Sequence, residues 1–261
     1  MRINSTNFKS ASKKAINDPS LQKALTNIHR GFVTKRAKAM TILPEFEALR
    51  DQARDLKNHV LAHLDTYLLQ YEKSVQAAGG QVHWAKDAKQ ERDIIGKICA
   101  QQNAKKVTKG KSMITEEIAL NDHLQAQGIS VLETDLGEYI LQLRKDHPSH
   151  IVAPAIHILK EQVADSFREA HQHLDNQRDL NDIDALLAEA RATLRQQFGQ
   201  ADVGITGANF LLADSGMAGI VTNEGNGDLT QMLAKTHIVV ASLEKVLPNF
   251  TAAALIVRLL A

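Results

Sequence analysis

The chain has 261 residues, 44% of them hydrophobic, which is enough to bury a sizeable core in one domain with an appendage or in two small domains. Its 31 Lys and Arg residues nearly balance its 30 Asp and Glu residues. A formal net charge of +1 therefore gives no overall electrostatic reason to expect nucleic acid or an anionic membrane as a partner, although specific basic patches stay open.

The N-terminal stretch 1–14 is polar and lacks the apolar core of a secretory signal. No window of the sequence approaches the roughly 18 consecutive apolar residues of a membrane span. Together these features predict a cytoplasmic protein without a membrane span.

Residues 18–78 predict helix throughout. Asp18 before Pro19 is a helix start signal, and apolar residues then recur at three- and four-residue spacing as far as Gly79 and Gly80. We therefore expect a helical N-terminal region over residues 1–78 and a second domain over residues 79–261.

After Gly80, short β-rich runs alternate with helical segments. Strands are expected at 81–85, 105–108, 129–134 and 150–153, and helices at 87–103, 115–127 and 136–144. More helix follows His157, ending with 183–199, and a second group of strands covers 202–206, 209–214, 217–222 and 237–242. The alternation predicts an α/β fold with a mostly parallel sheet and helices on both faces.

Two details refine this fold. The strands at 209–214 and 217–222 are close enough to form a hairpin that turns at 214–216, so the sheet should be mixed. The chain ends in FTAAALIVRLLA, an apolar helical segment with neither a polar tail nor a stop signal. This ending predicts that the natural protein continues beyond Ala261.

Ligands in open α/β sheets bind beyond the carboxyl ends of the strands, so the loops after the strands hold the candidate site residues. The first loop is KGKS, 109–112, in which Lys111 and Ser112 precede a helix with Thr115 as its expected N-cap. Lysines, a hydroxyl group and a helix N-terminus together favour an anion, and a capped helix with exposed lysines is the alternative. The stretch lacks the first glycine of a phosphate-binding Walker A loop, because position 105 is Lys.

Three further loops contribute candidates. Asp135 and Glu138 have the spacing of a capping box at a helix start, which favours a structural role. His157 would face the same end of the sheet, either as a hydrogen-bonded structural residue or as a base. Gly207 allows the backbone to approach a ligand closely, and Asn209 offers both a donor and an acceptor.

The fifth loop is TNEGNGDLTQM, 222–232, where polar groups are denser than a simple turn requires. Asn223, Glu224, Gly225 and Asn226 combine hydrogen-bonding groups with glycine flexibility, and Asp228 could cap a short helix LTQML. We place the centre of the site here, with a plain turn as the alternative.

Other motifs carry less weight. His59 and His63 are four residues apart, but HVLAH lacks the glutamate of a HExxH zinc site. The single cysteine, Cys99, lies in a segment with helical apolar spacing and is expected to be a buried thiol. One cysteine cannot hold a zinc ion or an iron-sulfur cluster, each of which takes about four ligands, so we expect no cofactor or metal in this chain.

Five stretches taken in order resemble the lactate utilization protein B family: KGKSMITEEIALNDHLQAQGISVLETDLGEYILQL, PSHIVAPAIH, ADVGITGANF, TNEGNGDL and KTHIVVASLEKVLP. This family is the iron-sulfur subunit of a bacterial complex that oxidises L-lactate to pyruvate. The resemblance implies that residues from about 80 onward form a LUD domain. It further implies a fold similar to ribose-5-phosphate isomerase, glucosamine-6-phosphate deaminase and CoA transferases.

The resemblance also implies partners and cofactors. It predicts the other subunits of the lactate-utilization complex, a small anionic ligand, and a downstream ferredoxin-like module whose CxxCxxCxxxCP motifs bind two 4Fe-4S clusters. None of those cysteines occurs in this chain, so electron transfer would lie outside it. The sequence departs from the family pattern in two places: Asp228 stands where members carry Arg, and Asp214-Ser215-Gly216 replaces an ETG-type triplet. A carboxylate in place of a guanidinium reverses the local charge at the anion-holding position.

Three functions follow. The first is the LUD-domain part of an iron-sulfur subunit of an L-lactate oxidoreductase complex, which binds a small anion, docks partner subunits, or does both. The second is a stand-alone enzyme similar to CoA transferases or sugar-phosphate isomerases, with Glu224 as a catalytic nucleophile that backbone donors of the glycine loop would assist. The third is a non-catalytic assembly module whose N-terminal helices bind a second copy or a partner subunit through their apolar stripe.

Overall fold

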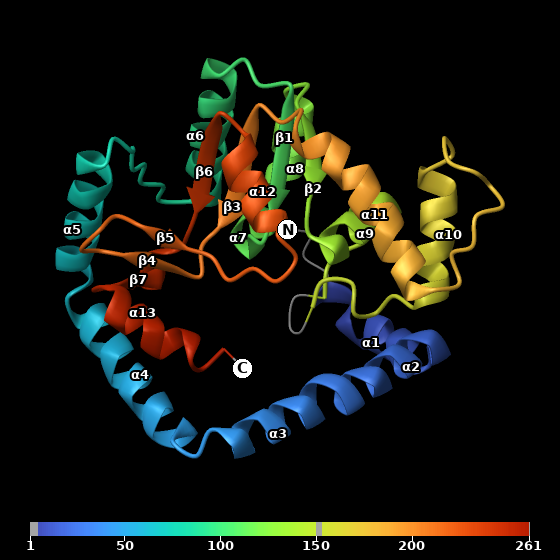
Figure 1. Ribbon diagram of the computed structural model, residues 1–261, viewed down its shortest axis with the longest axis horizontal. Helices are drawn as coiled ribbons and strands as arrows, with labels where there is room; N and C mark the ends of the chain where they lie inside the picture. The colour runs from blue at the N-terminus through green and yellow to red at the C-terminus, as the bar shows by residue number, and fades with distance from the viewer. Residues whose placement is uncertain (1–4, 150–152, 261) are drawn as a thin grey trace.

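The computed structural model describes residues 5–149 and 153–260 and contains two sheets (Figure 1). Sheet A is wholly parallel, with the order β2-β1-β3-β6. Its strands are β1 (Lys106–Gly110), β2 (Ser130–Glu133), β3 (Val203–Gly207) and β6 (Thr236–Val240). Sheet B has the order β5-β4-β7, from β4 (Phe210–Leu212), β5 (Ala218–Gly219) and β7 (Val246–Leu247).

Helices cover both faces of sheet A. On one face, α6 (Ala88–Gln101), α7 (Met113–Glu117) and α8 (Leu120–Ala126) enclose an apolar core around Val107, Val131, Val203 and Ile205. On the other face, α12 (Asn226–Leu233) lies against β3, β1 and β6. Beside it are α9 (Leu136–Arg144), α10 (Lys160–Ala170) and α11 (Ile183–Phe198), which share a second core near Leu132. Burial on both faces explains why β3 has no exposed residue.

Sheet B continues two strands of sheet A. Residues 208–209 connect β3 to β4, and residues 241–245, which include the short helix η3 (Leu243–Lys245), connect β6 to β7. Each pair is adjacent in its own sheet, β3 with β6 and β4 with β7. Sheet B therefore extends from the carboxyl end of one half of sheet A, and α13 (Phe250–Val257) packs on it.

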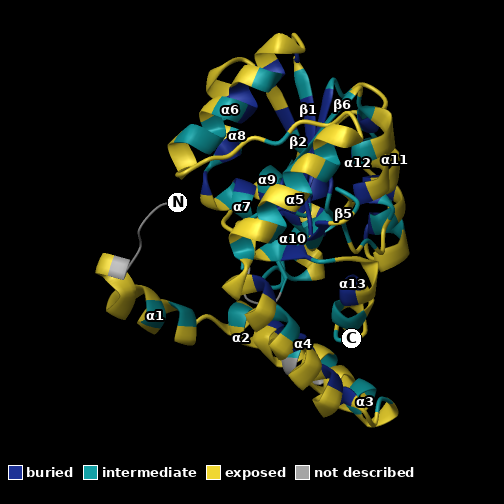
Figure 2. Ribbon diagram, turned by 90° about the vertical axis from the view of Figure 1, so that its left-hand side faces the viewer, coloured by how far each residue is buried: buried dark blue, intermediate teal, exposed yellow. Residues whose placement is uncertain are grey.

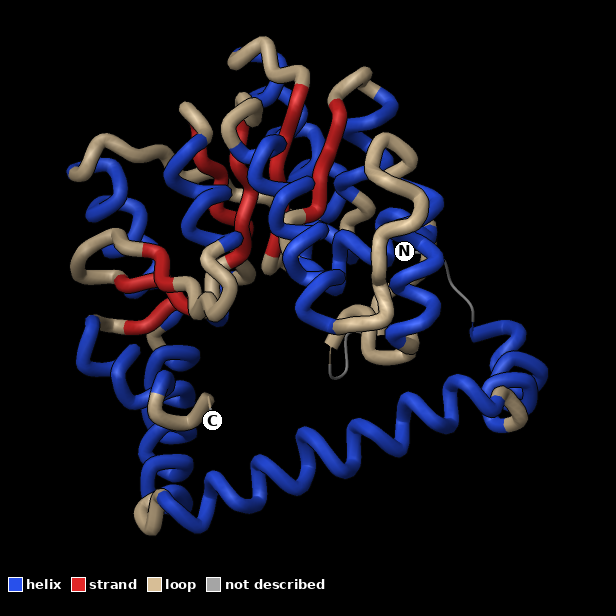
Figure 3. Tube along the Cα trace, turned by 45° about the vertical axis from the view of Figure 1, so that its right-hand side comes forward, coloured by secondary structure: helices blue, strands red, loops and turns tan. Residues whose placement is uncertain are grey.

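The N-terminal helices run along the bottom of the molecule and up one side (Figure 1). After η1 (Ser5–Asn7) come α1 (Phe8–Ile16), α2 (Pro19–Ile28), a π-helical turn at His29–Val33 and α3 (Thr34–Ile42). Then α4 (Phe46–Ala62) and α5 (Leu64–Ala77) pack on sheet B through Val60 and its neighbours. We call α1, α2, the π-helical turn and α3 the arm; Figure 3 shows it as a helical run below the body.

The predicted α/β class, the mostly parallel sheet with helices on both faces and the preceding helical region are confirmed. The 214–216 hairpin is present, because β4 and β5 are antiparallel, but it belongs to sheet B, and the described strands of sheet A are all parallel. The strand predicted at 150–153 lies almost entirely outside the described residues. The boundary between residues 78 and 79 stays a prediction.

Three element predictions were wrong. Residues 81–85 form no strand, because this segment is largely exposed and pairs with no other described segment. The helix predicted at 115–127 is two helices, since it begins after Ser112 and breaks at Ala119, whose φ of 51° is left-handed. The continuous helix predicted at 18–78 breaks near Pro44, which cannot continue it, and again at His63.

A backbone contact between β3 and α12 holds the two layers of the fold together. A methyl group added at Gly204 would lie 2.0 Å from the carbonyl oxygen of Thr230, so only glycine lets α12 lie this close to β3. Thr230 is itself buried and donates a hydrogen bond to the carbonyl oxygen of Asn226. The position of α12 therefore depends on the missing side chain at 204.

We expect Gly204→Ala to destabilise the protein by about 1–3 kcal/mol or more, because α12 must move away from β3. Urea unfolding followed by the fluorescence of Trp84 measures this change. Gly199→Ala is the matched control, because no atom lies within 4 Å of the added methyl group and φ there is −68°. This control should be neutral or slightly stabilising, and equal effects of the two substitutions would contradict the close-packing argument.

Candidate functional site

The carboxyl ends of β1 and β2 bring a lysine and a carboxylate together. Lys111 follows β1 in a left-handed conformation, with φ of 56°, and its Nζ lies 3.0 Å from Oδ2 of Asp135. Asp135 also caps α9, since its Oδ1 accepts a hydrogen bond from the backbone N–H of Gly137 at 3.1 Å. The two side chains are 17% and 19% exposed, so this ion pair is partly shielded but open to solvent.

The N-terminus of α12 meets the same place. Asn226 is buried and donates from Nδ2 to the carbonyl oxygen of Thr134, at the end of β2, at 3.0 Å. A methyl group added at Gly227 would lie 3.7–3.8 Å from Ile220, Thr222 and the Lys111 stem. One position at the carboxyl ends of β1 and β2 is therefore bordered by the first turn of α12, by Lys111 and by Asp135. The N–H groups of the helix and the ammonium of Lys111 both favour an anion there.

Gly207 has a role in the packing of the backbone. A methyl group there would lie 2.3 Å from the carbonyl oxygen of Lys111, so the glycine lets the chain after β1 cross the end of β3. Ser112 is likewise structural, because its Oγ caps α7 by accepting from the N–H of Thr115 at 3.4 Å. The prediction of Thr115 as the N-cap was therefore wrong by three residues.

A second polar group, which the sequence did not reveal, is buried beneath α7 and α8. Lys109 is fully buried, and its Nζ contacts Oε1 of Glu133 at 2.8 Å, Oε1 of Glu116 at 3.2 Å and Oγ1 of Thr115 at 3.0 Å. Burial works to lower the pKa of Lys109, but the carboxylates of Glu133, Glu116 and Glu138 outweigh it and raise the pKa above its ordinary value. Lys109 is therefore a buried cation.

Glu138 lies at the third position of α9 but does not form the predicted capping box. Asp135 caps through Gly137, and the buried Oε2 of Glu138 has no hydrogen-bond partner among the described residues. Burial and then the neighbouring Glu133 carboxylate raise the pKa of Glu138 to about 8. A buried carboxyl group with a raised pKa near an open cationic side chain is a functional candidate.

His157 and Asn209 each have hydrogen-bond partners of their own outside this cluster. His157 contacts Oγ of Ser149 at 2.9 Å through Nδ1 and Oδ2 of Asp146 at 3.4 Å through Nε2, so it ties down the segment after α9. Asn209 is exposed and accepts from the N–H of Val221 at 2.7 Å, which holds the β4–β5 hairpin. Both residues have structural partners.

The predicted centre of the site divides into two parts. Asn226 is buried in the cluster and Gly225, with φ of 74°, starts α12, but Asn223 and Glu224 are exposed. Glu224 has no hydrogen bond or ion pair with any described residue, so nothing here positions it as a nucleophile. Asp228 lies within the first turn of α12, two residues after the actual helix start, and is exposed.

A buried network between α10 and α11 was also missed. The hydroxyl of Tyr139 lies 2.7 Å from Nε2 of His171, whose Nδ1 lies 2.6 Å from Oε1 of Glu189. Arg178 donates to both oxygens of Glu189, at 2.6 and 3.0 Å. Burial works to raise the pKa of Glu189, but the bonds from Arg178 and His171 outweigh it and hold the pKa below its usual range. The network is enclosed and fixes the loop between the two helices.

This chain does not fit an iron-sulfur cluster. Cys99 is its only cysteine, is fully buried, and has a pKa that burial raises to about 11. A cluster takes about four thiolates, so no binding set exists here. Within residues 5–149 and 153–260, no three His, Cys, Asp or Glu side chains are arranged to hold a metal ion. None of the helices described is long and apolar enough to cross a membrane.

Comparison with known proteins gives consistent matches. The family model described as LUD domain matches residues 68–261. The chain is 41% identical over 263 residues to lactate utilization protein B of Bacillus subtilis (strain 168), a match that covers 100% of this chain and 54% of that protein. These matches confirm the resemblance found in the sequence.

A second relative has a different name. The chain is 39% identical over 261 residues to a protein of Escherichia coli (strain K12) named uncharacterized electron transport protein YkgF, again over 100% of this chain and 54% of that protein. The chain thus spans about half the length of the curated relatives it matches. No solved structure matches it significantly, so the expected similarity to sugar-phosphate isomerases and CoA transferases stays a prediction.

The buried lysine generates a stability prediction. Lys109→Met should destabilise the protein by about 3–5 kcal/mol, because it leaves the Glu133 carboxylate buried without its cation. Adding Glu133→Gln should recover part of the loss, since the unpaired charge is then removed. Urea unfolding of the two single variants and the double variant measures the coupling.

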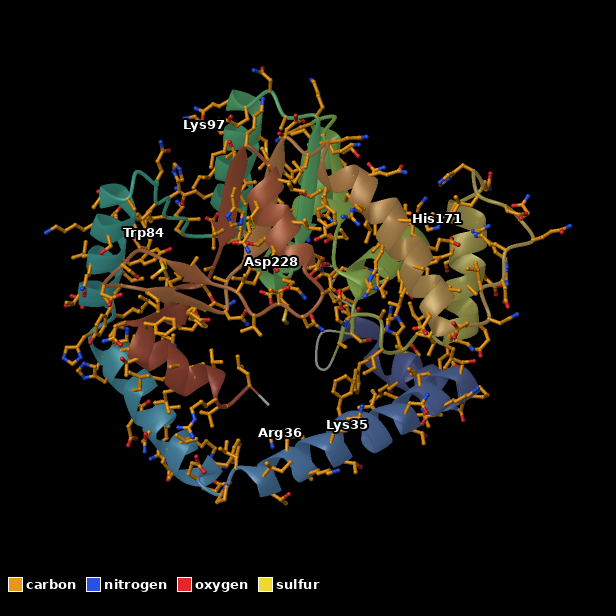
Figure 4. All side chains as sticks on the ribbon, viewed as in Figure 1. Lys35, Arg36, Trp84, Lys97, His171 and Asp228 are labelled. Carbon is orange, nitrogen blue, oxygen red and sulfur yellow. The ribbon has the colours of Figure 1, made fainter. Side chains whose placement is uncertain are left out.

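Lys97→Met is the control, because Lys97 is exposed on α6, at the top of Figure 4. It should change the free energy of unfolding by less than about 0.5 kcal/mol. If Lys109→Met were as mild as this control, the buried ion pair would not contribute to stability.

Proposed function

Because the chain belongs to the LUD domain family, we propose that it acts in cytoplasmic lactate utilisation as the part of an L-lactate-oxidising iron-sulfur subunit that binds a small carboxylate. The relatives' name supports the pathway. The observation that carries the binding role is the convergence of Lys111 with the N-terminus of α12 at the carboxyl ends of β1 and β2. The other subunits of the complex are its expected partners, and two 4Fe-4S clusters are expected in the matching proteins' remaining half.

The chemistry of the site suits a 2-hydroxy or 2-oxo acid. Lys111 supplies a cation, and the first turn of α12 supplies backbone N–H groups, both of which favour a carboxylate. Oγ1 of Thr222, beside Gly227, is buried without a hydrogen-bond partner among the described residues and is free to bond to a ligand. The carboxylate of Asp135 would accept a hydrogen bond from the hydroxyl of lactate.

The charge at the α12 end sets a limit on affinity. Asp228 lies in the first turn and Asp135 already pairs with Lys111, so a carboxylate ligand must compete with two negative groups. We therefore expect weak, millimolar-range binding rather than tight capture, because Coulomb repulsion offsets part of the attraction.

We expect Lys111→Met to reduce the affinity for L-lactate or pyruvate at least tenfold, because one charge-assisted hydrogen bond is worth about 1.5–3 kcal/mol. Isothermal titration calorimetry of the folded chain measures it. Lys97→Met removes the same charge far from the site and should bind as the wild type does.

The cellular role is tested in Bacillus subtilis. Replacing the matching half of its lactate utilization protein B with this chain should sustain growth on L-lactate, and the same hybrid carrying Lys111→Met should grow more slowly. A hybrid that folds and binds L-lactate but fails to support growth would contradict the proposed role.

The arm supports a second function, docking of another protein. Residues 1–44 contain nine of the 31 basic residues and one of the 30 acidic residues, so their formal charge is +8 and that of residues 45–261 is −7. Large apolar side chains are exposed along the arm, at Phe8 (69%), Phe32 (57%) and Ile42 (74%). Figure 2 shows the arm as mostly exposed.

The arm packs only loosely on the rest of its own chain. Ala24 is the only buried residue of the described parts of α1–α3, and Ile28 and Phe32 line a pocket together with Ile156 and Leu159. Helices of this length are marginal alone in water and gain stability by packing an apolar face. The acidic body of a second copy has the complementary charge, so we infer that the arm of one copy docks on the body of another.

The combined variant Phe8→Ser with Phe32→Ser should shift the protein from dimer to monomer, because it removes two apolar anchors of the arm. Sedimentation velocity measures the shift, and added salt should weaken the wild-type dimer through screening. Leu69→Ser, on the outer side of α5, is the control, because Leu69 is 66% exposed. A wild-type protein that is monomeric at low salt and high concentration would contradict this docking.

The stand-alone enzyme with Glu224 as nucleophile stays a prediction. Glu224 is exposed, so a bound substrate would have to organise the donors that stabilise the oxyanion.

A further inference from the structure

The donors of Lys109 are fully used by three partners. An ammonium offers three N–H groups, and here Glu133, Glu116 and Thr115 accept them. Lys109 therefore has no donor left for Glu138, although the two groups are close enough to interact electrostatically. Any hydrogen bond that Glu138 makes has to come from elsewhere.

Two buried carboxyl groups are left with an unpartnered oxygen. Oε1 of Glu133 accepts from both Lys109 and Asn121, the latter at 2.6 Å, while its Oε2 is buried without a partner in the part of the chain that the structure describes. Oε2 of Glu138 is also buried without a partner among the described residues. The side chains are almost wholly enclosed, since Glu133 is 2% exposed and Glu138 is 6% exposed.

The charge balance of this group requires a proton. If Glu116, Glu133 and Glu138 were all ionised, a single Lys109 would leave two net negative charges in the interior. Unpaired buried charge is avoided by a change of protonation, because isolated ions are far costlier to bury than neutral groups. Glu116 is 22% exposed and Glu133 holds two donors, so Glu138 is the member that takes up the proton.

Four charged groups act on Glu138 through their electrostatic fields. They are Lys109 on β1, Glu133 on β2, Asp135 at the start of α9 and Glu116 on α7. Burial is the largest cause of its raised pKa, Glu133 adds to it, and Lys109 opposes it. Asp135 also raises the pKa, and this is the carboxylate that pairs with Lys111. The buried proton and the anion position are therefore coupled through Asp135.

We propose that Glu138 is the proton-carrying group of the anion site. Glu138 is a neutral carboxylic acid in the free protein, and a small carboxylate binds at Lys111 only when Glu138 carries its proton. This inference rests on the proposed function for its ligand. When the anion binds to protein in which Glu138 is ionised, one proton passes from solvent to a carboxylate oxygen of Glu138. The added negative charge nearby makes the protonated form still more favourable.

The sign of the pH dependence follows from the raised pKa. At pH 6.5 the proton is already on Glu138, so binding takes up none. At pH 8.5 and above an increasing share of Glu138 is ionised, so binding takes up a proton and the affinity falls with pH. Well above pH 8 the association constant should fall about tenfold per pH unit, which is the limit for one obligatory proton.

Isothermal titration calorimetry in two buffers with different ionisation enthalpies measures the number of protons that are taken up on binding. With L-lactate as the probe, we expect an uptake that rises from near zero at pH 6.5 toward one at pH 9. Glu138→Gln should bind without proton uptake and with a flat affinity over this range, because the amide cannot ionise. Glu91→Gln is the control, because burial alone raises the pKa of Glu91 and it lies on α6 outside the site. This control should keep the wild-type uptake.

A ligand-free measurement separates the two claims. The infrared carbonyl band of a protonated carboxylic acid should be present at pH 7, disappear in Glu138→Gln and persist in Glu91→Gln. If this band is present but L-lactate does not bind at all, the ligand of the proposed function is wrong. If L-lactate binds with no proton uptake at pH 9, or if the band is unchanged in Glu138→Gln, the proton-carrying role of Glu138 is overturned.

Discussion

The ion pair of Lys109 with Glu133 is the constraint on which the rest of the site depends. Parallel pairing of β1 and β2 places these residues side by side on the same face of sheet A, where α7 and α8 cover them. Desolvation opposes burial of each charge, and Thr115, Glu116 and Asn121 offset part of this cost by adding hydrogen bonds to the pair. These three partners lie on α7 and α8, and the ion pair therefore fixes the position of both helices.

The same ion pair explains why the carboxyl edge of β1 and β2 has one enclosed polar group and one that is open to solvent. Beneath it, Lys109 is saturated and leaves Glu138 without a donor. Above it, Lys111 takes a left-handed turn and points its ammonium at Asp135 on the outside of the fold. Because Asp135 and Glu138 lie in one helical turn, a charge that moves at the exposed pair is felt at the enclosed one. The proposed anion site would therefore be linked to the buried proton electrostatically.

The sequence predicted what depends on local chemistry. Asp18 and Asp135 are N-caps, Gly79 ends α5 with φ of 85°, and the hairpin turns where Gly216 has φ of 73°. The sequence did not reveal the features that depend on strand register and on packing. Lys109 stands in KKVTKG, where lysines suggest an exposed segment, and only its alignment with Glu133 reveals the buried ion pair. Glu138 has the spacing of a capping box, but Asp135 caps through Gly137, which leaves Glu138 for another role.

The two halves of sheet A explain why the five predicted loops do not converge on one pocket. Beyond β3 and β6 the chain continues into sheet B, and Lys245 reinforces the junction by donating to the carbonyl oxygen of Ala208 at 2.7 Å. With α4 and α5 packed over it, this half of the carboxyl edge is structural, and Asn209 serves its hairpin. Only the β1–β2 half stays available to a ligand, and α12 closes on that half because Gly204 lets it approach. Under the proposed function, recognition of the anion would therefore be confined to Lys111, Asp135 and the start of α12.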